Sequence, residues 1–259
     1  MQGNKKKKKF TYITLLQILT IVGLLAYMQI AVTSGQISRI FMAAPSDIVK
    51  RGVDTITDGT LFPHLLLTLE EVLTGYLLAA VTGIAVGILW VLFPKLKAYM
   101  NLFCSAIMAV PKTAILPLLI LWFGIGFKSK VVLIFLFGVF TVLYNTVTGA
   151  KQCKNEYLKV AKVFEASRGQ TVFKVILPAA LPSIFNGLKL SAATALTGVV
   201  FAEIQSAKAG LGFLLSESQN NLDTARMFFL IILVTLISVG FVKIIGEIEY
   251  ITCHKWRKV

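Results

Sequence analysis

The chain alternates between long apolar runs and short polar segments. The apolar runs cover about 10–33, 65–93, 98–124, 130–150, 179–205 and 226–248. Each run is long enough to cross a bilayer as a helix, which takes about 20 residues. Apolar and polar residues do not alternate within the runs, so strands are excluded and helices are expected. The pattern predicts an all-α membrane protein with six transmembrane helices.

The first run begins directly after five lysines, Lys5–Lys9, and so has the charged start of a secretory signal peptide. Its apolar part is longer than the roughly 7–15 residues of a signal peptide, and no A-x-A cleavage site follows. We therefore expect a retained span. The chain then divides into a basic cytoplasmic N-terminus over 1–9, one six-helix transmembrane domain over 10–250, and a basic cytoplasmic tail over 251–259.

The composition supports membrane insertion and excludes several other classes. Hydrophobic residues make up 56% of the chain and charged residues 15%, against about 45–50% and about 25% in globular proteins. The three cysteines lie far apart, which argues against a disulfide framework and a structural zinc site. With only two histidines, a multi-histidine metal site is excluded.

The formal charge of +14 is distributed unevenly over the polar segments. With six spans both termini lie on one side of the membrane. That side carries sixteen of the 26 basic residues, and the opposite side, which includes Lys130, carries seven. The positive-inside rule therefore predicts that both termini are cytoplasmic. A nucleic-acid partner is excluded, because the basic residues lie at span ends and form no stripe with stacking aromatic residues.

The second span carries small residues at every fourth position, namely Gly75, Ala79, Gly83 and Gly87. These positions share one helix face, where small residues allow backbones to approach closely, as in G-x-x-x-G packing. We expect this face to pack against a neighbouring span, with a dimer interface as the alternative. Thr68 and Glu71 have the spacing of a capping box, which predicts that they open this helix.

The third span is interrupted by Pro111 and Pro117, each of which removes a backbone donor and bends or breaks a helix. Broken helices at membrane depth occur mainly where they are buried in protein or line a cavity. Lys112 lies beside the first break, and an ionisable group within a membrane is a functional candidate. The alternative for Lys112 is a packed or snorkelling lysine.

The segment 151–178 is basic but also carries an apolar stripe. The stripe consists of Tyr157, Val160, Ala161 and Phe164. Their spacing of i, i+3, i+4 and i+7 predicts one face of a short helix. We expect Gly169 to end this helix, a second turn over 171–176, and Leu177-Pro178 to stop it. Such a helix either lies on the bilayer or docks in a groove on another protein, and the residues alone favour neither explanation.

Residues 161–182 resemble the conserved cytoplasmic loop of ABC importer permeases, which reads E-A-A, three residues, G, nine residues, I-x-L-P. Counting back from Leu177-Pro178 places Val175 at the I position, Glu165 at the G position and Lys159 at the E position. The pair Glu165-Ala166 is therefore out of register with the motif. Lys159 and Glu165 stand where the family has Glu and Gly.

The similarity extends over roughly 45–250, in order and without large gaps, to the permeases for nitrate, taurine, aliphatic sulfonates and thiamine precursors. The similar segments are 111–126 in the third span, Asn145, Thr146 and Gly149 in the fourth, and 187–190, 199–203 and 210–212 in the fifth span and the following loop.

This resemblance implies a type I ABC importer permease fold in the plasma membrane of a bacterial cell. It implies a core of two permeases, here a homodimer, with an ATPase subunit beneath each permease and an extracytoplasmic solute-binding protein. The loop then docks its coupling helix on the ATPase, which favours the docking explanation. The coupling residues are Tyr157, Val160, Ala161, Phe164, Glu165, Ala166, Ser167, Gly169, Leu177 and Pro178.

The sequence contains no G-x-x-x-x-G-K-[ST] loop and no catalytic motif, so we expect no enzyme and no cofactor in this chain, with ATP and magnesium acting on the partner ATPase. The expected function is import of a small solute such as a sulfonate, taurine, nitrate or a vitamin precursor. Two alternatives stay open. One is a secondary transporter driven by an ion gradient, for which no inverted repeat and too few intramembrane carboxylates are found. The other is a membrane anchor that transports nothing.

Candidate residues of a translocation path lie in the third and fifth spans. They are Lys112, Lys189, Ser191, Thr194, Thr197 and Glu203. The three hydroxyl residues lie three positions apart and form a polar strip, although hydroxyl groups also hydrogen-bond across packed helices. The two lysines would attract an anion. Glu203 is either a gating or structural residue or an end-of-span residue in water.

The outer polar segment 34–64 contains a helix start at Pro45-Ser46-Asp47. Ile48, Val49, Val53 and Ile56 would lie mostly on one side of this helix. We expect it to lie along the outer surface, either beneath the docked binding protein or in the membrane interface alone.

Overall fold

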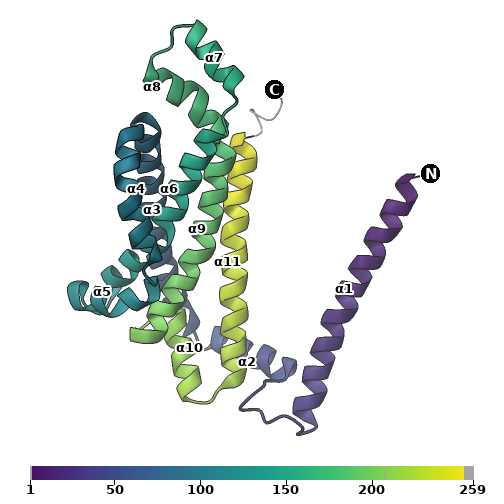
Figure 1. Cartoon of the computed structure of the whole chain (residues 1–259). Coiled ribbons are helices and arrows are strands. Elements are labelled where there is room, and N and C mark those ends of the chain that lie inside the picture. The colour runs from purple at the N-terminus through teal and green to yellow at the C-terminus, as the bar shows by residue number, and fades with distance from the viewer. Residues whose placement is uncertain (1, 207, 254–259) are drawn as a thin grey trace. The chain divides into compact units, whose positions relative to one another are not determined.

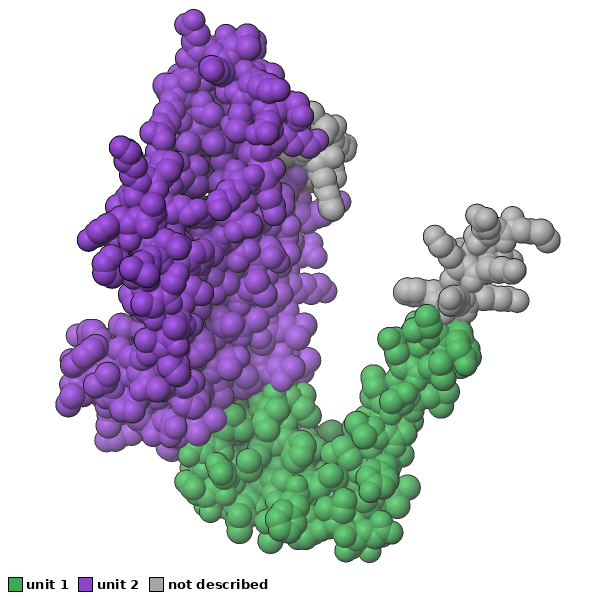
Figure 2. Space-filling view, viewed as in Figure 1, with its two compact units in different colours: residues 1–62, 215–232 green, residues 63–214, 233–259 purple. Residues whose placement is uncertain are grey.

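A computed structural model describes residues 2–206 and 208–253, so the predicted basic tail lies outside the described residues from position 254 onward. The chain divides into two units (Figure 2). Unit 1 comprises residues 1–62 and 215–232, and unit 2 comprises residues 63–214 and 233–259. The described residues form helices joined by short turns, in agreement with the all-α prediction.

Five helical segments among the described residues are long and apolar enough to cross a membrane. They are α1 (Gln2–Thr33), α3 (Leu61–Leu92), α6 (Phe127–Lys151), the segment Arg168–Ser206 that contains α9 (Leu177–Ser206), and α11 (Thr224–Cys253). A sixth span results if α4 (Pro94–Ala109) is counted together with the bent segment Lys112–Phe123. These elements coincide with the six apolar runs. The cytoplasmic placement of both termini stays a prediction.

The third span is broken at Pro111, one of its two predicted breaks, and its two halves are bent by 82°. Val110 has ψ 129° and Pro111 ψ 109°, both extended. A residue before proline is disfavoured in the helical region, which ends α4 at this point. The segment continues as a 3₁₀ turn, η1 (Lys112–Ile115), and α5 (Leu116–Phe123). Pro117 breaks nothing, because it lies in the first turn of α5, where no backbone donor is needed.

Unit 2 is built around α6, which packs along α9 (Figure 1). Its main core joins α3, α6, α9 and α11 through Val72, Tyr76, Ile134, Phe185, Ala192, Ala195, Leu196, Val199 and Ile245. The small residues of α3 face α6. A Cβ added to Gly83 would lie 2.8 Å from the carbonyl oxygen of Val139, and one added to Gly87 would lie 2.7 Å from Thr146 Cβ. Glycine at these positions therefore sets how closely α3 and α6 approach.

The capping-box prediction for Thr68 and Glu71 is wrong. Helix α3 begins at Leu61, so both residues lie inside the helix. Their side chains are fully buried and bind other helices instead of the backbone of their own. The spacing of a capping box is short enough to occur by chance inside a long apolar helix, and only tertiary packing separates the two cases.

In unit 1, α2 (Pro45–Thr57) begins at the predicted proline. The side that it buries consists of Ile48, Gly52 and Thr55, whereas Val49, Val53 and Ile56 are exposed. The ring of Phe229 lies where a side chain at position 52 would stand, 2.7 Å at Cε2 from an added Cβ. Of the four residues predicted to form the apolar side of α2, only Ile48 is therefore buried, and the other three lie exposed on the surface of the unit.

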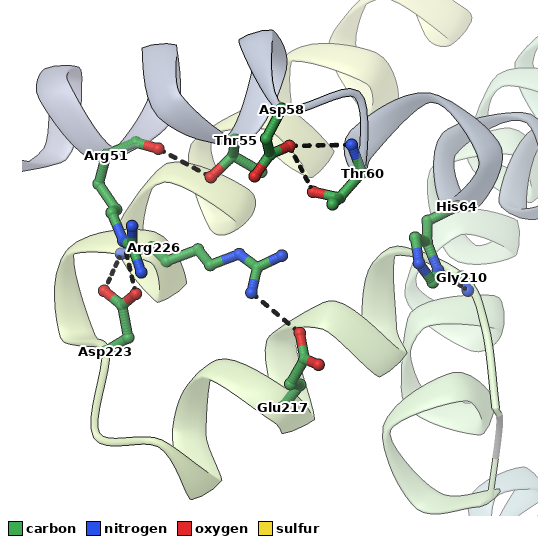
Figure 3. Close-up of polar contacts among 9 residues, drawn as sticks. All are labelled: Arg51, Thr55, Asp58, Thr60, His64, Gly210, Glu217, Asp223 and Arg226. Atoms are coloured by element: carbon green, nitrogen blue, oxygen red, sulfur yellow. Dashed lines mark hydrogen bonds and ion pairs between the residues drawn. The ribbon is translucent and has the colours of Figure 1, made fainter.

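Ion pairs tie the elements of unit 1 together. Arg51 Nε donates to Asp223 Oδ2 at 2.7 Å, and Arg226 Nη1 donates to Glu217 Oε2 at 2.9 Å (Figure 3). The hydrogen bond and the charge of Asp223 both raise the pKa of Arg51. After α2, the backbone N–H and hydroxyl of Thr60 donate to Asp58, and these bonds lower the pKa of its carboxyl group.

Candidate functional site

The loop 151–178 folds in unit 2 as two short helices at one end of α6 and α9 (Figure 1). The first, α7, covers Asn155–Val163 and carries the predicted apolar stripe. The second, α8 (Arg168–Thr171), continues through a π-helical turn, η2 (Val172–Ile176), directly into α9. Leu177-Pro178 does not stop the helix as expected, because a π-helical turn, which departs from the regular i→i−4 hydrogen bonds, directly precedes it and leads into α9.

Helix α7 ends at Val163, with Phe164 as its C-cap, instead of at the predicted Gly169, which lies within α8. The N–H of Ala166 donates to the carbonyl of Ala161 at 3.0 Å, and the N–H of Glu165 donates to the carbonyl of Lys162 at 3.0 Å. This pair of bonds is a Schellman motif, which needs a left-handed residue at the position of Glu165. Glu165 has φ 51°, a conformation that glycine adopts without strain and other residues adopt at a cost. The permease motif has glycine at the position of Glu165, and the backbone conformation there is one that favours glycine.

We expect Glu165→Gly to leave the loop intact or to tighten it, and Glu165→Val to loosen it. A β-branched residue is poorly accommodated at positive φ, and such strain costs about 1–3 kcal/mol. Hydrogen exchange of the amides of residues 161–171 should therefore rise several-fold in the valine variant and not in the glycine variant. Equal exchange in both variants would show that the left-handed cap does not hold the loop.

The second helix of the loop has a capping box that the sequence analysis did not single out. Ser167 Oγ accepts from the N–H of Gln170 at 3.2 Å, and Gln170 Oε1 accepts from the N–H of Ser167 at 2.8 Å. The S-x-x-Q spacing was the available signal. Two adjoining caps, one ending α7 and one starting α8, give the turn over 164–167 a defined backbone.

The apolar stripe of α7 and the start of α9 enclose a groove of about 650 Å³. It is lined by Tyr157, Val160, Ala161, Phe164, Ala166, Gln170, Lys174, Val175, Pro178 and Ala179. Of these lining residues Ala161 is buried, whereas Phe164 is 80% exposed. Val163 is equally exposed and was not among the predicted residues. The end of α7 therefore exposes two large apolar side chains, Val163 and Phe164, beside this groove.

A cluster of buried polar residues joins α3, α6, α9 and α10 (Leu211–Asn220); we call Thr68, Glu71, Lys130 and Glu203 the Glu203 cluster. Thr68 Oγ1 donates to Glu203 Oε1 at 2.7 Å and accepts from the N–H of Leu211 at 2.9 Å. The N–H of Gly212 donates to Glu203 Oε2 at 2.7 Å. Thr68 and Glu203 thus cap the N-terminus of α10, where N–H groups lack partners and a carboxylate is favoured.

The Glu203 cluster also contains an ion pair between Lys130 Nζ and Glu71 Oε1. Glu203 is 1% exposed and Lys130 4% exposed. Glu203 is therefore not an end-of-span residue in water. Lys130, which the charge count placed in the outer polar segments, is buried as well. Gly210, with φ 117°, lets the chain pass directly against Glu203. The N–H of Gly210 donates to His64 Nδ1 at 2.9 Å (Figure 3).

The six predicted path residues do not converge on one site. Lys189 Nζ lies 2.6 Å from Glu249 Oε2, and Lys112 Nζ lies 5.8 Å from the centre of the Phe137 ring. Thr194 and Thr197 donate to carbonyls of their own helix. The hydroxyl of Ser191 is buried against Gly138 and makes no hydrogen bond to any described residue. In the described part of the chain, no group of three or more His, Cys, Asp or Glu side chains is arranged to hold a metal ion.

Comparison with known proteins identifies the family. Residues 60–246 match the model of the binding-protein-dependent transport system inner membrane component. The chain is 32% identical to the putative aliphatic sulfonates transport permease protein SsuC of Bacillus subtilis (strain 168), over 90% of this chain and 84% of that protein. It is also 32% identical to the taurine transport system permease protein TauC of Escherichia coli (strain K12), over 81% and 78%.

The fold is shared with solved transporters. An inward-facing structure of the MetNI methionine ABC transporter matches with a TM-score of 0.67 at 18% identity, over 74% of this chain and 96% of that one. An amino acid ABC transporter matches with a TM-score of 0.60 at 15% identity, over 78% and 97%. With its membrane-spanning helices and this family match, the chain belongs to the inner-membrane permease components of binding-protein-dependent ABC importers.

Proposed function

We propose that this permease subunit imports a small anion, as one of two identical copies in a complex with two ATPase subunits and an external solute-binding protein. The family match over 60–246 supports the role in import. The names of several relatives support a solute with an anionic group, since they refer to aliphatic sulfonates, to nitrate and to taurine, which carries a sulfonate group. ATP and magnesium would act on the ATPase, and the binding protein would select the solute.

The loop 151–178 carries the proposal, because it offers what a docking helix needs. Its turn is held by two caps, and Val163 and Phe164 project from it as apolar anchors. Apolar anchors of an amphipathic helix fit a groove on a partner. Basic residues surround them, among them Lys159, Lys162 and Arg168, so a groove with an acidic rim is the complementary surface.

The helix that follows the loop connects it mechanically to the Glu203 cluster. Residues Arg168–Ser206 form one helical segment of 39 residues, with Glu203 near its far end. A helical segment moves as a unit, so a displacement of the loop by the ATPase would reach α3, α6 and α10 through this cluster. We propose the cluster as the hinge point of the cycle, and Lys112 as a candidate for contact with the anion.

Reconstitution tests the proposal. The chain is purified from cells that co-express candidate ATPase and solute-binding proteins from the same organism, and uptake of taurine, an alkanesulfonate and nitrate is measured in proteoliposomes. We expect the ATPase to co-purify and uptake to need both ATP and the binding protein. Uptake that follows an ion gradient without ATP would indicate a secondary transporter, and co-purification without any uptake would favour a membrane anchor.

A further inference from the structure

Helix α10 begins on three successive backbone N–H groups that all donate to side chains of unit 2. We call these groups the amide triad; they belong to Gly210, Leu211 and Gly212. The first donates to His64 Nδ1 at 2.9 Å (Figure 3), and the other two donate to Thr68 and Glu203 of the Glu203 cluster. The start of α10 is therefore held against α3 and α9 by three acceptor side chains.

The three acceptors differ in how they respond to pH. The hydroxyl of Thr68 does not titrate, and Glu203 is 1% exposed and accepts hydrogen bonds on both carboxyl oxygens. His64 is partly exposed, and histidine is the side chain whose ordinary charge change falls between pH 5 and pH 8. Because Nδ1 accepts from the Gly210 N–H, it carries no proton and the ring is neutral. A proton added to Nδ1 would face this N–H, so the hydrogen bond is lost when the ring becomes charged.

The surroundings of His64 accommodate a positive charge. Its ring stacks on Phe213, with centroids 5.7 Å apart and an interplanar angle of 16°, and an aromatic face attracts a cation within about 6 Å. The Glu203 cluster contributes two buried carboxylates and one buried ammonium group, namely Glu71, Glu203 and Lys130. Charged side chains at neighbouring positions of the chain are exposed to solvent, namely Glu70, Lys128 and Lys208. A proton on His64 therefore adds positive charge where buried negative charge is in excess.

The backbone that His64 holds lies directly against Glu203. Gly210 has φ 117°, and a Cβ at this position would overlap the carboxyl group of Glu203. The bond from the Gly210 N–H to His64 fixes the backbone in this place. We propose that His64 is a pH switch, whose protonation releases the amide triad from α3 and loosens its contact with Glu203. In the predicted orientation α3 begins on the outer side of the membrane, so the switch responds to external pH.

Amide hydrogen exchange of residues 208–214 tests the switch in the full-length protein in lipid nanodiscs. It is measured at about pH 5.5 and about pH 7.5, on either side of the ordinary histidine range, and corrected for the intrinsic pH dependence of exchange. In wild type the loss of one hydrogen bond on acidification should raise the corrected exchange about fivefold. His64→Asn offers an acceptor oxygen near the position of Nδ1 but takes up no proton, so its exchange should stay slow at both pH values. His64→Lys carries a charge and no acceptor, so its exchange should be fast at both.

The matched control is His254→Asn, which removes the only other histidine of the sequence and should behave like wild type. Three results would overturn the proposal. The first is corrected exchange in wild type that is the same at both pH values. The second is a pH effect that persists in His64→Asn or disappears in His254→Asn, which would assign it to another group. The third is a His64→Lys variant as well protected as wild type at about pH 7.5, which would show that the bond to His64 does not hold the triad.

The effect of the switch on transport rests on the proposed function, because it requires the Glu203 cluster to be the hinge point. Uptake in proteoliposomes is measured at the same two external pH values, and wild type is divided by His64→Asn so that the pH dependence of the partner proteins cancels. We expect this ratio to fall at the lower pH, since a released triad no longer passes on the displacement of α9. A change in exchange with a constant uptake ratio would confirm the switch and contradict the hinge role. A change in the uptake ratio with constant exchange would contradict the switch.

Discussion

Replacing Phe164 with aspartate is expected to abolish ATP-coupled uptake while the protein stays folded and inserted. Phe164 is 80% exposed, so the change costs the free subunit little. On a docked ATPase the same side chain would be buried. Full burial of a large apolar side chain contributes about 1.5–3 kcal/mol, and an unpaired buried charge costs more. We therefore expect at least about a tenfold fall in uptake and in ATPase co-purification. Uptake in proteoliposomes and pull-down of the ATPase measure the two effects.

Two further variants separate docking from folding and from bilayer contact. Phe173→Asp is the matched control, because Phe173 is an exposed phenylalanine of the same loop that does not line the groove. It should keep most of the uptake. If both phenylalanine variants lose membrane association equally, the loop lies on the bilayer and the docking assignment is wrong. Ala161→Asp should differ from both by disordering the loop, since Ala161 is buried, and hydrogen exchange over 155–178 would show it.

Replacing Lys130 with methionine is expected to destabilise the protein more than any other single change considered above. Lys130 and Glu71 are both buried, with side chains 5% and 0% exposed. Removal of one partner leaves a buried carboxylate close to Glu203 without compensation. Such a loss typically costs about 3–5 kcal/mol, which is a large share of a domain's stability. Thermal unfolding in detergent and the yield of inserted protein measure this effect.

The pair Lys189–Glu249 provides the comparison, because its side chains are 31% and 24% exposed. Lys189→Met should cost only about 0–1 kcal/mol. The double variant Lys130→Met/Glu71→Gln should recover most of the stability. If it also recovers uptake, the ion pair serves the fold alone, whereas recovered stability without uptake would support a role in the transport cycle. A single Lys130→Met variant as stable as wild type would contradict the buried ion pair.

The spans were predictable because membrane insertion depends on local composition. Twenty consecutive apolar residues satisfy the bilayer whatever surrounds them, so the six runs coincide with helices. The face of Gly75, Gly83 and Gly87 was recognisable for a related reason, since small residues at one spacing have few roles in a long helix. The break at Pro111 followed from the loss of one backbone donor.

The polar residues inside the spans were predicted less well. Thr68 and Glu71 had capping-box spacing within one helix, but Thr68 caps α10, far away in sequence, and Glu71 pairs with Lys130 on α6. Lys189 suggested an anion and binds Glu249 instead. The partner of a buried charge can lie on any helix that packs around it. The sequence of one helix does not show which other helices pack against it. The end of α7 was also misplaced, because glycine suggested Gly169 while Glu165 takes the left-handed conformation.

The sequence by itself determined that this chain crosses a membrane as helices, where its third span breaks and which loop carries an apolar stripe among basic residues. These features depend on short-range physics, namely transfer to lipid, proline geometry and helical periodicity. Only the tertiary structure decided that Glu203 and Lys130 are buried in one cluster, and that Phe164 projects while Ala161 does not. These features depend on which helix faces pack together. The packing decides how deeply each side chain is buried, and burial in turn decides the strength of its electrostatic interactions.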